Sequence, residues 1–290
     1  MPLVTEYAND ALVITDWVED HLEEFGSDDP DYRLVEADIE YDESYAQGHI
    51  PNAIGFRWTD ELQDPHQRDL LKKEQFEELM GSRGITEDST VVLYGDEWNQ
   101  WAAYTYWQFK YYGHEDVYLL DGGRKYWFDN DYETTTDEPD FPAQEYHASG
   151  HDEDIRTYRQ NVEEAMEGNL PLVDVRSPEE FRGEIIAPPD SEETARRAGH
   201  IPDAQSIPWS NNVNDDGTFK SREELQEFYN DQGVTDDQSV IAYCRIGERS
   251  SITWFTLHEL LGYNSVQNYD GSWTEWGNMI RAPIETGESD

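Results

Sequence analysis

The segment Gly233–Tyr243 has the sequence GVTDDQSVIAY and nearly repeats an earlier segment, Gly84–Tyr94, with the sequence GITEDSTVVLY. The two copies are 233 − 84 = 149 residues apart. Each begins with a polar turn and ends in an apolar run that is typical of a buried strand. Repetition over such a distance indicates duplication of a globular unit, because solenoid repeats are much shorter.

Two further blocks recur in the same order. Gly48–Ala53 reads GHIPNA and Gly199–Ala204 reads GHIPDA, at an offset of 199 − 48 = 151 residues. Asp121-Gly122-Gly123 corresponds to Asp270-Gly271-Ser272 at 270 − 121 = 149 residues. Three blocks at a nearly constant offset predict two similar units. The chain has 290 residues, which is enough for two domains with separate cores.

The domain boundary is predicted in a polar stretch that contains Pro139, Pro142 and Gly150. We expect an N-terminal domain over residues 1–137, a linker over 138–153 and a C-terminal domain over 154–290. Before its GHIPDA block the second copy is longer than the first, and the extra residues form a loop over Gly183–Ala198. This loop is either a tolerated insertion or a lid.

Strand and helix patterns alternate within the second copy. The expected elements are Leu170–Val175, Ser221–Gln232, Ser239–Tyr243, Ser250–Leu261 and Val266–Tyr269. Ser221 and Glu224 form a capping-box pattern at one helix start, and Gly262 is placed to end the other helix. The fold class is therefore α/β, with a mostly parallel sheet flanked by helices in each domain. Ligands are expected at the carboxyl ends of the strands.

The chain is strongly acidic, with a formal net charge of −45 at pH 7. Such a surface repels nucleic acid and anionic membranes, so neither is an expected partner. The acidic residues are spread along the chain, which favours adaptation to a salt-rich cell interior over a dedicated cation-binding surface. At molar salt the Debye length is about 3 Å, so an anionic substrate can still approach. No apolar run is long enough to span a bilayer and residues 1–20 lack a signal-peptide pattern, so the cytoplasm is the expected location.

The chain contains one cysteine, Cys244, directly after the strand of the second copy. A disulfide within the chain is therefore excluded. Gly95 stands at the corresponding position of the first copy, where an acidic loop follows. Only the second copy can perform thiol chemistry.

The residues after the cysteine favour a reactive thiol. A short turn with Gly247 leads into the predicted helix, so backbone N–H groups and the helix N-terminus would face Cys244. Arg245 and Arg249 add positive charge. We expect this environment to lower the pKa of the thiol into roughly the 3.5–7.5 range. The alternative interpretation is a buried, inert cysteine at a strand end.

The pattern Cys244-Arg245-x-Gly247-x-Arg249-Ser250 resembles the active-site loop of rhodaneses. The GHIP blocks and Asp270-Gly271-Ser272-Trp273 resemble further signatures of that family, and the tandem arrangement with a degenerate first copy resembles its thiosulfate sulfurtransferases. The resemblance covers nearly the whole chain. It implies that thiosulfate gives its outer sulfur to Cys244, sulfite leaves, and cyanide or a thiol accepts the sulfur. The substrate-binding residues implied or expected are Arg245, Ile246, Gly247, Glu248, Arg249, Ser250, Arg182 and Trp273.

The sequence of the loop after Cys244 distinguishes this chain from related enzymes with other activities. Phosphatases of the same fold use Cys-x5-Arg, whereas Arg249 gives Cys-x4-Arg here. Mercaptopyruvate-type members usually have a small residue after the cysteine, where this chain has Arg245. Animal thiosulfate enzymes carry a lysine at the position of Ile246 and an anion-contacting arginine at that of Glu180, for which Arg182 is a candidate substitute. A persulfide carrier that is loaded by a desulfurase and serves a partner protein remains an alternative to an enzyme.

Three of four other residues have two interpretations each. Asp174 either orients Arg245 or caps a turn, and Trp273 either walls the pocket or packs in the core. His200 is expected to be structural, because the inactive copy has His49 in the same motif. Glu248 either tunes Cys244 or faces solvent. The histidines form no metal-ligand pattern and no nucleotide-binding glycine loop is present, so no metal or cofactor is expected.

Overall fold

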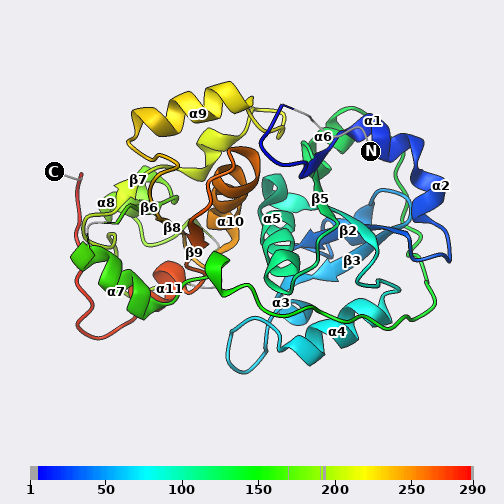
Figure 1. Ribbon diagram of the computed structural model, residues 1–290, viewed down its shortest axis with the longest axis horizontal. Helices are drawn as coiled ribbons and strands as arrows, with labels where there is room; N and C mark the ends of the chain where they lie inside the picture. Colours follow the sequence, from blue (N-terminus) through cyan, green and yellow to red (C-terminus); the bar gives the residue numbers. More distant parts are fainter. Residues whose placement is uncertain (1–5, 169, 190, 192–193, 289–290) are drawn as a thin grey trace. The chain divides into compact units, whose positions relative to one another are not determined.

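The computed structural model describes residues 6–168, 170–189, 191 and 194–288 of the chain. The described chain forms two compact units (Figure 1). The first consists of Asp10–Asp152 together with Asp215–Phe219. The second consists of Glu6–Asn9, Glu153–Asn214 and the residues from Lys220 to the end of the described chain.

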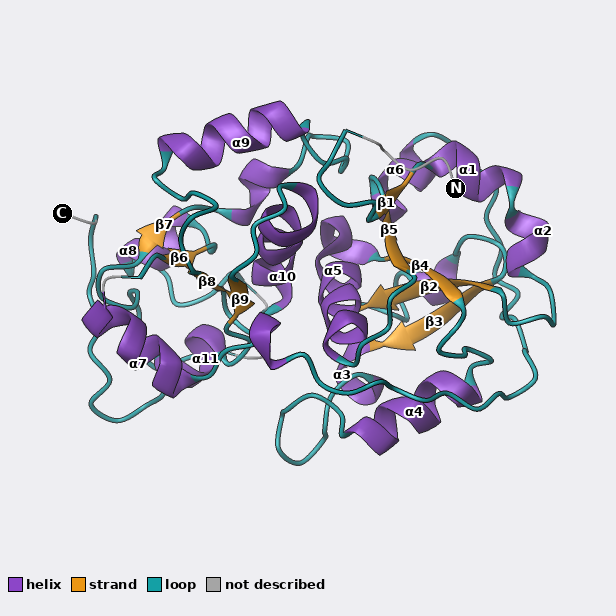
Figure 2. Ribbon diagram, viewed as in Figure 1, coloured by secondary structure: helices purple, strands orange, loops and turns teal. Residues whose placement is uncertain are grey.

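The first unit is built on a parallel sheet that has five strands within the described residues. Its strands are β1 (Leu12–Val13), β2 (Tyr32–Asp38), β3 (Ala53–Arg57), β4 (Thr90–Tyr94) and β5 (Val117–Leu120), in the order β1-β5-β4-β2-β3. The helices are α1 (Thr15–Asp20), α2 (Leu22–Phe25), α3 (Trp58–Glu61), α4 (Lys73–Ser82), α5 (Asp96–Tyr111) and α6 (Gly123–Asp129), with a 3-10 turn at Tyr45–Gln47. Helix α5 packs against β2, β4 and β5, and α2 contacts β2 (Figure 2). Strand β4 is almost fully buried, as expected for a parallel sheet with both faces covered.

The second unit repeats this arrangement with four strands among its described residues. They are β6 (Leu172–Asp174), β7 (Gln205–Ser206), β8 (Val240–Tyr243) and β9 (Val266–Asn268), in the parallel order β7-β6-β8-β9. The helices are α7 (Arg159–Gly168), α8 (Pro178–Arg182), α9 (Arg222–Asp231), α10 (Glu248–Phe255) and α11 (Ser272–Trp276). Shorter helical turns cover Glu153–Ile155, Trp209–Asn212 and Thr256–Leu260. A parallel bridge between Arg156 and Asn268 stands where β1 pairs with β5 in the first unit. The predicted α/β class and duplication are thus confirmed.

Local sequence signals account for the helix ends around the cysteine. The capping box at Ser221 is present, with the Ser221 side chain accepting from the Glu224 N–H. Helix α10 begins at Glu248, two residues earlier than predicted, because Gly247 is left-handed at φ 107° and can occupy the N-cap. Its last turn, Thr256–Leu260, widens into a π-helix, and left-handed Gly262 follows.

The histidines of the two GHIP blocks have the same structural role, as predicted for His200. The His49 ring stacks on Tyr45 with centroids 3.8 Å apart, and its Nδ1 is 2.9 Å from the Tyr45 carbonyl oxygen. The His200 ring stacks on Phe181 at 3.6 Å, and its Nδ1 is 2.8 Å from the Phe181 carbonyl oxygen. Both rings are buried, so each block fixes the loop in front of its strand.

The predicted linker covers residues 138–153, and of these the segment 138–152 belongs to the first unit. Tyr146 is buried and lies edge-on to Phe76, and the Gln144 N–H donates to the Gly81 carbonyl at 2.8 Å. The polar composition of the segment concealed these contacts, because one aromatic side chain and backbone hydrogen bonds are enough to attach it. The segment has no helix or strand of its own.

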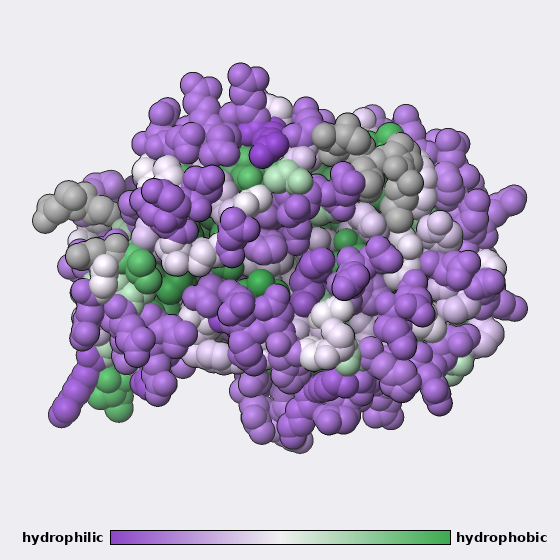
Figure 3. Space-filling model, viewed as in Figure 1, coloured by the Kyte–Doolittle hydropathy of each residue, from purple (hydrophilic) through white to green (hydrophobic). Residues whose placement is uncertain are grey.

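The surface agrees with the composition. The face in Figure 3 is predominantly hydrophilic, with small apolar areas between polar side chains. Within the described residues, no helix has both the length and the apolar character that a membrane span requires.

Candidate active site

Cys244 lies at the carboxyl end of β8, which is flanked by β6 and β9 in the second sheet. The Cys244 N–H donates to the Ser272 Oγ at 3.0 Å, and the Cys244 carbonyl accepts from the Trp273 N–H at 3.0 Å. The next carbonyl, that of Arg245, accepts from the Thr274 N–H at 3.0 Å. Hydrogen bonds from the start of α11 therefore fix the backbone of Cys244 and Arg245. The carboxyl end of a parallel strand is the edge at which the sequence predicts ligand binding.

The sulfur of Cys244 has polar contacts, although the residue is 0% exposed. The Gly247 N–H donates to Sγ at 3.1 Å, and the Sγ–H donates to Glu248 Oε2 at 3.1 Å. The Ser250 Oγ lies farther away, at 3.6 Å. Cys244 is thus buried, as the alternative interpretation of an inert cysteine expects, but its sulfur faces polar groups. The contacts also show that Glu248, which is 2% exposed, faces the thiol and not solvent.

Two carboxylates balance the two arginines of the loop. Glu248 Oε1 is 3.6 Å from an Arg245 nitrogen and 3.4 Å from Arg249 Nε. The two terminal nitrogens of Arg249 donate to the carboxylate of Glu180 on α8, at 2.8 and 3.2 Å. The formal charges of these four side chains sum to zero. The site is therefore a compact network of buried ion pairs, and not the unopposed cationic cradle that the sequence suggested.

The expected lowering of the Cys244 pKa is wrong for this resting arrangement. Burial raises the pKa of the Cys244 thiol, the Glu248 carboxylate acts in the same direction, and Arg249 opposes them. The prediction failed because it counted the positive charges of the loop without their acidic partners. Burial alone would also raise the pKa of Glu248, but Arg249 and Arg245 hold it below its ordinary value, so Glu248 is a carboxylate.

Glu180 is a residue of this network that sequence reasoning considered only as the position of a missing arginine. It completes a capping box with Ser177, because the Ser177 N–H donates to Glu180 Oε2 at 3.0 Å. Burial would raise the pKa of Glu180, yet Arg249 holds it below the ordinary value. The Ser-Pro-Glu-Glu pattern at 177–180 could have placed this carboxylate at a helix start. Its pairing with a residue 69 positions away could not be read from the sequence.

Other candidate residues lie apart from the sulfur. The Arg182 side chain pairs with Glu179, Glu184 and Glu288, and these contacts give no support for a role as a substitute anion-binding arginine. Asp174 does not orient Arg245. It accepts from the Arg176 N–H at 3.0 Å and pairs with the Arg176 guanidinium at 2.6 Å.

Trp273 belongs to the core of the second unit and is 1% exposed. Its indole N–H donates to the Arg197 carbonyl at 2.9 Å, and the Arg176 guanidinium lies 4.4 Å from the centroid of its ring. It serves the site through its backbone bond to Cys244. Ser250 is buried and donates at 2.7 Å to Asn268 Oδ1, and Ile246 is buried as well.

The first unit has Gly95 at the position equivalent to that of the cysteine, where a side chain has little room. A Cβ atom at Gly95 would overlap the carbonyl oxygen of Ala37. The Gly95 N–H donates to Asn99 Oδ1 at 3.0 Å, and three successive residues, Glu97, Trp98 and Asn99, have left-handed backbone angles. The backbone after β4 is therefore committed to a different turn.

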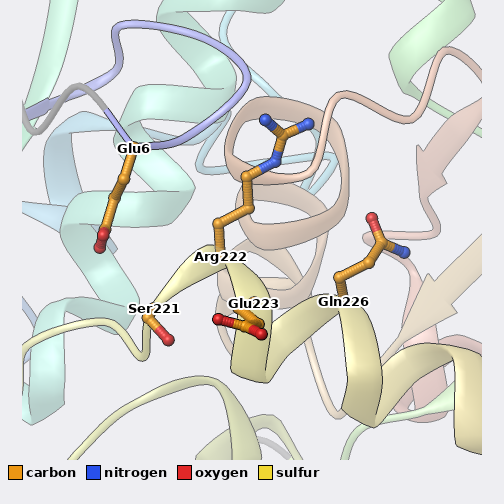
Figure 4. Close-up of a pocket in the computed structure, with 5 residues that line it drawn as sticks. All are labelled: Glu6, Ser221, Arg222, Glu223 and Gln226. Atoms are coloured by element: carbon orange, nitrogen blue, oxygen red, sulfur yellow. The ribbon is translucent and has the colours of Figure 1, made fainter.

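A surface pocket in the second unit is separate from this site. Figure 4 shows its lining side chains, which come from Glu6 and from the start of α9: Ser221, Arg222, Glu223 and Gln226. No residue of the cysteine loop lines it. Among the described residues, no group of three or more histidine, cysteine or acidic side chains is arranged to hold a metal ion.

Comparison with known proteins identifies the family. The model of the rhodanese-like domain matches residues 15–130 and again residues 158–279. The chain therefore belongs to the rhodanese family and contains two rhodanese-like domains.

Similar proteins carry sulfur-transfer names. A Haloferax volcanii protein named "Putative thiosulfate sulfurtransferase" is 65% identical over 283 residues, which cover 98% of this chain and 99% of the relative. Sulfur carrier protein TtuD of Thermus thermophilus is 51% identical over 284 residues, covering 96% of this chain and 98% of that protein.

Solved structures of EanB and YnjE have the same fold. A complex of EanB with ergothioneine has a TM-score of 0.83 and 27% identity, covering 96% of this chain and 70% of EanB. YnjE has a TM-score of 0.81 and 25% identity, covering 96% of this chain and 68% of YnjE. Another EanB structure holds a cysteine persulfide in a tetrahedral intermediate state with ergothioneine.

Proposed function

We propose that this protein transfers the outer sulfur of thiosulfate to cyanide or a thiol through a persulfide on Cys244. The observation that carries the proposal is the position of the sulfur at the strand–helix junction. There it accepts a hydrogen bond from Gly247 and lies beside a network that includes Arg245 and Arg249. Relatives of this chain that are named putative thiosulfate sulfurtransferases support thiosulfate as the donor. The cysteine persulfide in an EanB structure supports a persulfide as the intermediate.

The reaction needs two displacements at sulfur. Cys244 attacks the outer sulfur of thiosulfate and sulfite leaves, and the acceptor then attacks the outer sulfur of the persulfide. The chain has a single cysteine, so the acceptor must come from outside it.

Donor binding must rearrange the ion pairs, because Cys244 is 0% exposed at rest and both arginines already face carboxylates. We expect the donor sulfonate to replace Glu248 as the partner of Arg245 and Arg249. The new charge-assisted hydrogen bonds to the sulfonate contribute about 1.5–3 kcal/mol each and offset the stabilisation that the buried Glu248 carboxylate loses.

A sulfur-carrier function is the second candidate, and the 51% identity to the carrier TtuD favours it specifically. A carrier would accept sulfur at Cys244 once and release it to a partner protein. Steady-state assays separate the two functions. An enzyme forms thiocyanate from thiosulfate and cyanide over many turnovers, whereas a carrier stops after about one equivalent per protein or continues very slowly.

The variant Cys244→Ser tests the proposal. We expect it to lose thiocyanate formation at high salt and to keep the circular dichroism spectrum of the wild type, since the substitution replaces a single side-chain atom, Sγ, by a smaller one. Glu227→Gln, which changes an exposed residue on α9, is a matched control that should keep full activity. Undiminished activity of the serine variant would refute the role of Cys244.

A further inference from the structure

The hydrogen of the Cys244 thiol points to a fixed carboxylate. Glu248 Oε2 lies 3.1 Å from Sγ, within reach of a hydrogen bond that involves sulfur. The same oxygen accepts the Ile246 N–H at 3.2 Å, and Glu248 is 2% exposed. The carboxylate is therefore held beside the sulfur by the backbone of the loop and is shielded from bulk water.

The hydroxyl of Ser250, which also lies near the sulfur, is not an equivalent proton acceptor. Ser250 Oγ is 3.6 Å from Sγ, but it lies 2.7 Å from Asn268 Oδ1 and 3.1 Å from the Gly247 carbonyl oxygen. Its single hydrogen is best used toward Asn268. Gly247 contributes an N–H, which donates and cannot take a proton. Among the described contacts of Sγ, Glu248 is thus the group that can act as a base.

Charged groups from the cysteine loop and from helices α8 and α10 determine whether the Glu248 carboxylate is ionised. Arg245 and Arg249 face Glu248 from the loop and from α10, and Glu180 faces Arg249 from α8. At rest the two guanidiniums stabilise Glu248 as an anion. An anionic donor that binds to the same guanidiniums weakens this stabilisation, so the proton affinity of Glu248 rises when the donor is in place.

We propose that Glu248 is the catalytic base that accepts the Cys244 proton when the thiol attacks the sulfur donor, and returns it when the sulfur leaves. This inference rests on the proposed sulfur transfer. In the first step the Sγ–sulfur bond forms, the sulfur–sulfur bond of thiosulfate breaks, and sulfite departs with the electron pair. The thiol proton moves to Glu248, so a thiol, a thiosulfate dianion and a carboxylate become a persulfide anion, a sulfite dianion and a carboxylic acid.

The second step restores the starting state. Cyanide attacks the outer sulfur, thiocyanate leaves, and Cys244 becomes a thiolate beside protonated Glu248. The proton then returns from Glu248 to the sulfur, so no proton is gained or lost over the cycle. Such a shuttle explains how a buried thiol whose pKa is raised can still act as a nucleophile near neutral pH.

The test compares two pH midpoints in the full-length protein at high salt. One is the midpoint of thiolate formation, followed by ultraviolet absorbance of the thiolate. The other is the midpoint of single-turnover persulfide formation with thiosulfate, followed by mass spectrometry. In the wild type, transfer should persist well below the thiolate midpoint. In Glu248→Gln, the two midpoints should coincide, so that transfer falls by about 100-fold two pH units below the thiolate midpoint.

Two more variants complete the experiment. Glu248→Asp keeps a carboxylate and should recover part of the separation between the midpoints, and it remains informative if the glutamine variant does not fold. Glu227→Gln should behave as the wild type. A glutamine variant that transfers sulfur as well as the wild type at every pH, with the same profile, would overturn the role of Glu248 while leaving the proposed function intact. A wild-type protein that gains no sulfur would instead defeat the proposed function itself.

Discussion

Replacing Glu180 by glutamine tests whether the ion pair with Arg249 supports the second unit. Glu180 is 0% exposed and Arg249 is 7% exposed, and two charge-assisted hydrogen bonds join them. Breaking a buried pair by removing one partner costs about 3–5 kcal/mol. Arg249 keeps Glu248 as a partner at 3.4 Å, and glutamine can still accept the Ser177 N–H, so the lower end applies. We expect Glu180→Gln to reduce the free energy of unfolding by about 3 kcal/mol.

The assay is equilibrium unfolding in denaturant at constant high salt, followed by circular dichroism. The matched control is Glu179→Gln, one residue earlier on α8, where the carboxylate is exposed and lies 3.6 Å from the Arg182 guanidinium. Exposed pairs contribute about 0–1 kcal/mol, so the control should stay close to the wild type. Equal unfolding free energies for the two variants would refute the assignment of Glu180 as a buried structural partner of the loop.

Two further predictions concern the first unit. It should lose stability as the pH rises from about 4 to about 8. Burial raises the pKa of Glu36 to about 7 and the pKa of Asp38 and Asp96 to about 8, so over that range the folded state holds protons that the unfolded state has already released. Thermal unfolding should show a falling midpoint that Asp96→Asn makes less steep, and a midpoint independent of pH would contradict the reasoning. Gly95→Cys in a Cys244→Ser background should gain no persulfide from thiosulfate, because the new Cβ has no room beside Ala37. Mass spectrometry tests this, and sulfur bound at position 95 would show that the first unit can host the chemistry.

The fold was largely predictable from sequence because the decisive signals are local or repeated. The 149-residue repeat identified two α/β units, and the Ser221–Glu224 capping box placed the start of α9. The position of Cys244 between a buried strand and a helix followed from the apolar run before it and the glycine after it. Element ends lie within two residues of the predictions when the π-helical turn Thr256–Leu260 is counted with α10. The left-handed Gly247 accounts for the difference at the start of α10.

The electrostatics of the site could not be predicted in the same way. The arginines after Cys244 are visible in the sequence, but Glu180 reaches Arg249 only because α8 and α10 pack near each other in the folded unit. The partner of Asp174 was also unpredictable, since the choice between Arg176 and Arg245 depends on side-chain direction at a strand end. A prediction from the loop alone therefore gave the wrong direction for the Cys244 pKa.

The most direct measurement is mass spectrometry of the Cys244 peptide, prepared without reductant before and after the protein meets thiosulfate. Our account predicts the addition of one sulfur atom on Cys244, and its loss when cyanide is added. A peptide that remains unmodified at high salt across the pH range, while the protein is folded, would contradict the assignment of Cys244 as the sulfur-accepting residue for thiosulfate.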